Sequence, residues 1–124
     1  MSSSYRDLKV WQKSIDLAEN VYRLTAKFPN SELYGLTSQM RRAAVSIASN
    51  IAEGWGRHSR KDYSRYVQMA GGSNDELRTQ IVIAERLGFG SPKLLAEATT
   101  LADEIGRMLG GLEKFLETPR KKPA

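Results

Sequence analysis

Residues 36–52, "LTSQMRRAAVSIASNIA", decide the fold of this chain. Apolar residues recur in this stretch at intervals of three and four, which is the spacing of one face of an α-helix. They are Leu36, Met40, Ala43, Ile47 and Ile51. The second half, "AAVSIASNIA" (43–52), is apolar or small almost all the way round, which is typical of a helix buried on several sides. The stretch therefore predicts a central helix with other helices packed closely around it.

The same helical spacing continues on both sides of this stretch, and no segment alternates cleanly in twos as a half-buried strand does. Prolines and glycines interrupt it at three places, where helices are expected to end. The interruptions are "FPNSE" (28–32), "EGWGRHS" (53–59) and "LGFGSP" (87–92). Each contains residues suited to cap the next helix. The candidate caps are Asn30 or Ser31, Ser59 and Ser91. We therefore predict helices over about 7–27, 32–54, 60–87 and 92–117.

Connections this short place consecutive helices beside each other and antiparallel. The predicted fold class is therefore all-α, an antiparallel up-down-up-down four-helix bundle that occupies residues 1–118 as one domain. The remaining residues, 119–124, carry three basic side chains and two prolines, and we expect them to form a basic disordered tail.

Two of the predicted helices, 7–27 and 32–54, have more apolar surface than one bundle core needs to cover. In the first of them the apolar residues form two seams, one beginning at Trp11 and the other at Leu17. Contiguous exposed apolar surface of that breadth usually marks an interface. We therefore predict a homo-oligomer in which these two helices supply most of the contact. The alternative is a monomer in which helix 32–54 lies deep inside a compact bundle.

Several classes of chemistry lack the residues that they need. The chain has no cysteine, no Glu-x-x-His pair, and a single histidine, His58, which lies in a predicted turn. These absences exclude a thiol nucleophile, a thiolate metal site and the carboxylate–histidine di-iron pattern of helix bundles. We expect no catalytic residue, no metal and no cofactor, so the protein is not predicted to be an enzyme. Without a long apolar run or a signal-peptide pattern, we expect a cytoplasmic protein.

Basic charge gathers in the first part of the chain. Residues 1–70 contain 11 Lys/Arg against 6 Asp/Glu, whereas residues 71–118 contain 5 against 8. The densest cluster lies in the turn between the second and third helices, beside the aromatic side chains of Trp55 and Tyr63; it consists of Arg57, Arg60, Lys61 and Arg65. Basic groups that contact phosphates, beside rings that stack on bases, favour nucleic-acid binding. The alternative is a solvated turn.

Polar residues also fall among the apolar positions. Ser46, Asn50 and Glu53 lie one turn apart on one side of the second helix, and Asn74 falls in the apolar face of the third. Buried polar groups need hydrogen-bond partners. One interpretation is a catalytic or ligand pocket. The interpretation that we favour is a register-fixing network between helices, partnered by Arg41, Arg42 or Glu76.

Most of the chain, about residues 5 to 117, resembles a known bacterial family. Three segments carry the resemblance: "YRDLKVWQKSIDLA" (5–18), "YRLTAKFPNSELYGLTSQMRRAAVSIASNIAEGWGR" (22–57) and "GSNDELRTQIVIAERLG" (72–88). They resemble the four-helix-bundle proteins encoded in intervening sequences of bacterial 23S rRNA genes, also called S23 ribosomal proteins. That family is similar to the accessory variability proteins of diversity-generating retroelements, which associate with a reverse transcriptase and bind nucleic acid.

The resemblance implies a ring-like homopentamer without enzymatic activity, whose basic surface engages RNA or DNA. On the matching positions, it adds Arg41 and Arg42 to the nucleic-acid-binding candidates, although these arginines would also suit a salt bridge between subunits or a charged pore. The leading hypothesis is an oligomeric bundle that binds nucleic acid, with structured RNA favoured. The alternative is an oligomeric scaffold that docks a partner protein such as a polymerase.

Overall fold

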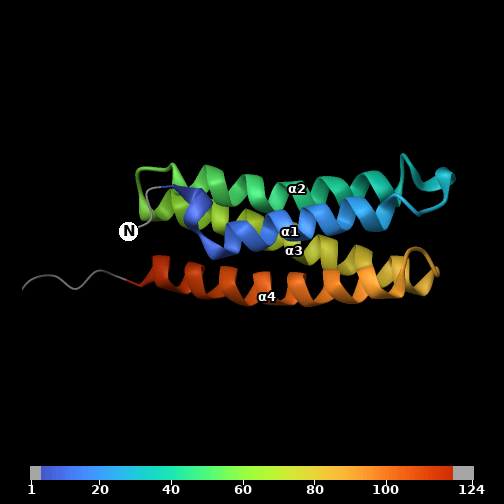
Figure 1. The fold of residues 1–124 in the computed structure, drawn as a ribbon. Helices are drawn as coiled ribbons and strands as arrows, with labels where there is room; N and C mark the ends of the chain where they lie inside the picture. Colours follow the sequence, from blue (N-terminus) through green and yellow to red (C-terminus); the bar gives the residue numbers. More distant parts are fainter. Residues whose placement is uncertain (1–3, 119–124) are drawn as a thin grey trace, which may run out of the picture.

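The computed structural model describes residues 4–118, so the predicted disordered tail, 119–124, lies outside the described residues. All regular structure within residues 4–118 is helical. The four α-helices are α1 (Lys9–Thr25), α2 (Leu36–Trp55), α3 (Arg60–Arg86) and α4 (Pro92–Glu117), and two short 3-10 turns are η1 (Tyr5–Asp7) and η2 (Asn30–Glu32). The prediction of an all-α chain with four helices is confirmed. Figure 1 shows the four helices side by side along one long axis, each reversing the direction of the one before.

The core lies along this axis, because each helix packs against two others. Helix α1 contacts α2 and α4, and α3 contacts the same two helices from the other side. One large side chain from each helix illustrates the core, since all four are fully buried: Leu17, Ile47, Leu77 and Ile105. The apolar seam predicted within residues 36–52 is also buried at Met40, Ala43 and Ile51.

The breaks before α3 and α4 are built by capping serines. The Ser59 hydroxyl accepts a hydrogen bond from the Asp62 N–H at 3.1 Å, and the Ser91 hydroxyl accepts one from the Leu94 N–H at 3.3 Å. Between α3 and α4, Gly90 has a φ of +83°, and a Cβ there would lie 2.5 Å from Leu24 Cδ1. Only glycine fits this turn, because both the backbone conformation and the contact exclude a side chain.

The bounds of the first two helices differ from the prediction. Helix α2 begins at Leu36, not near residue 32, and α1 spans Lys9–Thr25 rather than 7–27. The residues Asn30–Glu32 form the 3-10 turn instead, and Gly35 has a non-helical backbone. The Glu32 carboxylate accepts a hydrogen bond from the Leu36 N–H at 3.2 Å, so a glutamate side chain serves α2 where Asn30 or Ser31 was expected to act as a cap.

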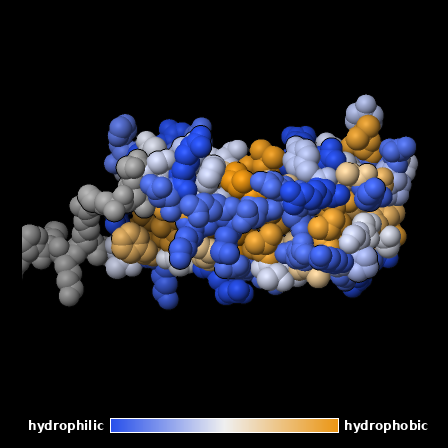
Figure 2. Space-filling view, viewed as in Figure 1, coloured by the Kyte–Doolittle hydropathy of each residue, from blue (hydrophilic) through white to orange (hydrophobic). Residues whose placement is uncertain are grey.

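The broad apolar surface of α2 is largely covered within one chain. Ala44 and Ala48 are buried, and among the large apolar side chains of this helix Val45 is the one exposed, by 44%. Exposed large apolar side chains are also found on α3, at Val82 and Ile83. Figure 2 shows hydrophobic patches separated by hydrophilic side chains along the face with α1 in front. The central place of α2 in a compact bundle therefore explains part of the pattern that predicted an oligomer.

Helices α3 and α4 contain glycines in their interiors. At Gly71, Gly72, Gly110 and Gly111, the place that a Cβ would occupy has no atom within 4 Å apart from the adjacent residues and the nearby backbone of the same helix. Glycine in a helix interior costs about 1 kcal/mol relative to alanine. No close helix contact inside the chain requires these four glycines.

Candidate nucleic-acid interface

The turn between α2 and α3 is held together by close packing at Gly54. A Cβ at Gly54 would lie 2.9 Å from Tyr66 Cβ and 3.0 Å from Tyr63 Cδ1. The Trp55 and Tyr63 rings meet edge to face, with centroids 6.4 Å apart. Half-burial also raises the pKa of the Tyr63 hydroxyl, because the phenolate form would lose hydration. The first aromatic residues of α3 therefore pack on the end of α2 and are not free platforms.

Arg57 is engaged inside this turn. Its Nη2 donates to Glu53 Oε2 at 2.7 Å and to the Tyr66 hydroxyl at 2.6 Å, and its guanidinium carbon lies 4.5 Å from the centre of the Tyr66 ring. The hydrogen bond to Glu53 raises the pKa of Arg57 above its ordinary value. The positive charge of Arg57 is therefore partly balanced by a neighbouring carboxylate.

Arg60 contacts residues at the end of α4, far along the chain from its own position. Its guanidinium donates to the backbone carbonyls of Phe115 and Thr118, and it stacks on the Phe115 ring at 4.9 Å. These carbonyls lie at the C-terminal end of α4, where a helix leaves acceptors unsatisfied and favours positive charge. Arg60 therefore joins the start of α3 to the end of α4, a structural role that sequence reasoning did not assign to it.

Lys61 and Arg65 are the most available basic groups of the turn. Both are exposed and, within residues 4–118, neither makes an ion pair or a hydrogen bond. Both line a hollow of about 410 Å³ between α3 and the end of α4. The Arg65 guanidinium carbon lies 5.1 Å from the centre of the Tyr66 ring, so Tyr66 is contacted by Arg57 and by Arg65.

The basic turn is the segment from Arg57 to Arg65 at the junction of α2 and α3. The structure places Arg41 and Arg42 away from it, about 20 Å along the axis of α2 at 1.5 Å per residue. Arg41 Nε donates to the Thr25 hydroxyl at 2.9 Å, and the guanidinium lies over the Tyr22 ring at 4.6 Å. Arg42 is exposed and makes no ion pair or hydrogen bond in the described part of the chain. The six basic candidates therefore belong to two separate surfaces.

The five predicted network residues do not form one network. Ser46 and Asn50 do come together, since Asn50 Nδ2 donates to the Ser46 carbonyl at 2.9 Å and to its hydroxyl at 3.0 Å. The Ser46 hydroxyl then contacts the Ser73 hydroxyl of α3 at 2.9 Å. The expectation that Arg41, Arg42 or Glu76 partners this group is wrong. Ser73 was missed because a serine on a mixed helix face gives no signal of its partner.

The other three members lie elsewhere. Glu53 pairs with Arg57, and the exposed Glu76 carboxylate accepts a hydrogen bond from Gln80 Nε2 at 3.3 Å. Asn74 is fully buried, and its Nδ2 donates to the Ala102 carbonyl of α4 at 2.9 Å. Asn74 therefore ties α3 to α4, whereas Ser46 ties α2 to α3.

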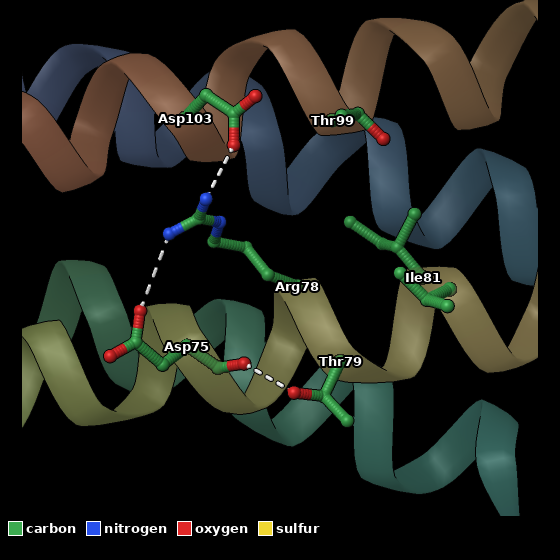
Figure 3. Close-up of a pocket in the computed structure, with 7 residues that line it drawn as sticks. Asp75, Arg78, Thr79, Ile81, Thr99 and Asp103 are labelled. Carbon is green, nitrogen blue, oxygen red and sulfur yellow. Dashed lines mark hydrogen bonds and ion pairs between the residues drawn. The ribbon is translucent and has the colours of Figure 1, made fainter.

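In a hollow between α3 and α4, an arginine is paired with carboxylates of both helices. Arg78 bridges Asp103 of α4 at 3.0 Å and Asp75 of its own helix at 3.5 Å (Figure 3). With one arginine between two carboxylates, this arrangement links the two helices. Across residues 4–118, no group of three or more histidine, cysteine or carboxylate side chains is arranged to hold a metal ion. No helix in the same range is long and apolar enough to cross a membrane.

Four antiparallel helices, joined at their ends by arginine, tyrosine and backbone contacts, define the class as a small four-helix-bundle protein. The chain belongs to the 23S rRNA-intervening sequence protein family, whose model matches residues 6–111. The predicted family is thereby confirmed.

The fold is similar to a crystal structure of a protein of unknown function from the S23 ribosomal protein family of Bacteroides thetaiotaomicron VPI-5482. The two chains are 21% identical with a TM-score of 0.74, and the match covers 85% of this chain and 95% of the other. No curated protein sequence shows a significant match. The similarity to retroelement accessory proteins stays a prediction.

Proposed function

We propose that this protein is a non-enzymatic, oligomeric, cytoplasmic bundle that binds nucleic acid, with structured RNA favoured, through basic side chains. The observation that carries the proposal is the start of α3, where the Tyr66 ring has a guanidinium from Arg57 and another from Arg65 against it. Lys61 stands one helical turn before Arg65. Because the Tyr66 ring is packed on the end of α2, these positive groups suit phosphates and not stacked bases. The family name, which refers to intervening sequences of 23S rRNA, supports RNA as the ligand.

The contacts within the basic turn indicate which of its basic residues are available to bind phosphate. Lys61 and Arg65 are exposed and without ion pairs in the described residues, so they are the first choices for phosphate contacts. Arg57 shares its charge with Glu53 and is a secondary choice. Arg60 holds the end of α4, so a variant of Arg60 would mix binding with stability.

The test is a double substitution, Lys61→Ser with Arg65→Ser, measured by fluorescence anisotropy with a labelled RNA hairpin from low to physiological salt. We expect weaker binding and a log–log salt slope that is flatter by up to about 1.8, because each neutralised phosphate accounts for about 0.9 of the slope. The matched control is Lys93→Ser with Arg107→Ser, which removes the same charge from exposed positions on α4. Equal losses in both variants would assign the effect to net charge alone, and an unchanged Lys61/Arg65 variant would contradict the assignment.

A second candidate function is a scaffold that docks a partner protein such as a polymerase. The observation in its favour lies at the end of α3 and just beyond it, where Val82, Ile83 and Leu87 are exposed by 50%, 44% and 58%. Exposed apolar side chains this close together suit a protein interface. This function predicts no direct nucleic-acid binding at low salt. It also predicts a partner that stays bound after nuclease treatment and dissociates when Val82 and Leu87 are changed to serine.

A further inference from the structure

A groove beside the start of α2 is lined by aromatic, cationic and hydroxyl side chains, of which Arg42 and Tyr34 make no hydrogen bond or ion pair within residues 4–118. It has a volume of about 620 Å³ and lies between the end of α1, the turn after it and the first turns of α2. The side chains that line it include two tyrosines, two arginines and three hydroxyl groups from Thr37, Ser38 and Ser46, but no carboxylate. The hollow of the basic turn, in contrast, includes Asp62 and Glu117. The groove is therefore the more strongly positive of the two surfaces.

Tyr34 is the most exposed aromatic side chain of this groove, at 94%. It lies in the turn between α1 and α2, which protrudes from the bundle at the end opposite the basic turn (Figure 1). The turn is ordered by the hydrogen bond from the Leu36 N–H to the Glu32 carboxylate. A ring that is held out from an ordered turn, with both of its faces open, is a stacking platform for a flat partner.

The two arginines of the groove complement this ring. Arg41 is fixed in place by Thr25 and Tyr22, and among the described contacts only its Nε serves as a hydrogen-bond donor. Arg42 has no hydrogen bond or ion pair within residues 4–118. Glu76 lines the adjoining hollow together with Arg42, but its carboxylate accepts from Gln80 and makes no ion pair with Arg42. The guanidinium donors left over can therefore bind an anion, and phosphate oxygens match their geometry.

We infer that this groove binds an unpaired segment of nucleic acid, with one base stacked on Tyr34 and neighbouring phosphates on Arg41 and Arg42. The inference rests on the proposed function. It adds the groove as a second binding surface and assigns to it the unpaired part of the same nucleic acid. A base can stack on an exposed ring only when it is not enclosed in a duplex, and structured RNA offers such bases in loops, bulges and ends. The basic turn would then contact backbone phosphates, while the groove selects for an unpaired base.

The test compares two RNA probes with the full-length protein: an unpaired strand of roughly twelve nucleotides, and a fully paired duplex of the same sequence. Tyr34→Ala is expected to weaken binding of the unpaired strand at least about fivefold, because a base stacked on an aromatic ring contributes about 1–3 kcal/mol. Tyr34→Phe, which keeps the ring, is the matched control and should bind like the parent protein. Arg42→Gln should flatten the salt slope for the unpaired strand by about 0.7.

Three outcomes would overturn the inference, and they are distinguishable. Parent-level affinity in Tyr34→Ala and Arg42→Gln, with weaker binding in the Lys61/Arg65 variant, would leave the proposed function standing and remove the groove from it. A changed particle size in sedimentation velocity, with unchanged affinity, would make the groove a contact between copies or with another protein. No binding of either probe by the parent protein at low salt would overturn the proposed function itself, and the groove with it.

A second measurement avoids substitutions altogether. The parent protein is irradiated with an unpaired RNA strand that contains 5-bromouridine, and the crosslinked peptides are identified by mass spectrometry. A crosslink to the peptide that contains Tyr34 would support the groove as the site. Crosslinks confined to residues 57–66 would overturn it.

Discussion

The basic turn and the groove are both made of arginines and tyrosines, but they use them differently. In the turn, Arg57 binds Glu53 and Tyr66, and Arg60 binds carbonyl groups at the end of α4. In the groove, Arg42 and Tyr34 make no comparable contact within the described chain. Two of the four cations in the cluster that is denser in the sequence therefore join helices, while Lys61 and Arg65 stay exposed. Charge density along a chain reports how many cations are present, and only the structure reports how many of them are already engaged.

The largest expected effect tests whether the turn is a structural joint. Gly54→Ala should lower the free energy of unfolding by about 1–3 kcal/mol, because its Cβ would press on the Tyr66 Cβ, which cannot move without the helix. Gly71→Ala is the control, since its Cβ would meet open space in a helix interior. That control should gain up to about 1 kcal/mol. Urea unfolding followed by circular dichroism measures both, and a neutral Gly54→Ala would show that the turn tolerates looser packing.

The next effect separates two neighbouring cations of the turn. Arg60→Gln should lower the free energy of unfolding by about 1 kcal/mol, because the end of α4 loses its charged donor. Lys61→Gln should change it by less than about 0.5 kcal/mol, since the lysine is exposed and unpaired in the described residues. The same unfolding measurement applies. Equal effects from the two substitutions would mean that the contacts of Arg60 add nothing to stability.

A smaller difference is expected between the two arginines of the groove. Arg41→Gln should lower the free energy of unfolding by about 0.5–1 kcal/mol, because it removes the hydrogen bond to Thr25 and the contact with Tyr22. Arg42→Gln should leave stability unchanged within error. A destabilising Arg42→Gln would show that Arg42 has a structural partner in solution, such as another copy of the chain, and would weaken the case for a free groove.

The smallest effect concerns pH. Burial raises the pKa of Tyr63 above its ordinary value of 10.0, so the folded protein holds this proton more tightly than the unfolded chain does. The stability that depends on the neutral hydroxyl is therefore fully present below pH 10 and is lost as the pH rises through the folded pKa. Urea unfolding of the parent and of Tyr63→Phe between neutral and strongly alkaline pH checks this. If the two proteins show the same pH dependence, the burial of Tyr63 has no consequence for its ionisation.

The sequence predicted the fold well because helices leave periodic signals. The seam from Leu36 to Ile51, the capping serines at 59 and 91 and the glycine stops are local features, and local features can be read from spacing. The start of α2 could not be placed in this way. It depends on a 3-10 turn and on a hydrogen bond from Leu36 to the side chain of Glu32, and glutamate is not among the usual capping residues.

The candidate site was less predictable, because it depends on contacts between distant residues. Nothing in the turn sequence indicates that Arg60 reaches Phe115, 55 positions later, or that Ser46 faces Ser73. The exposure of Tyr34 was equally hidden, because the sequence of a turn does not show whether its tyrosine packs against the bundle. Periodicity assigns a residue to a face, whereas the identity of its partner depends on how the helices are set against each other.

The interior glycines are distributed unevenly among the four helices. Helix α1 has no glycine and α2 has one, at its last turn, whereas α3 has two and α4 has three along their middle and later turns. Each interior glycine makes the helical state less favourable relative to local opening. The α3–α4 half should therefore be the yielding half, in which amide protons exchange with solvent first. We expect amide protons of the α1–α2 half, which includes the Arg41/Arg42 groove, to exchange later.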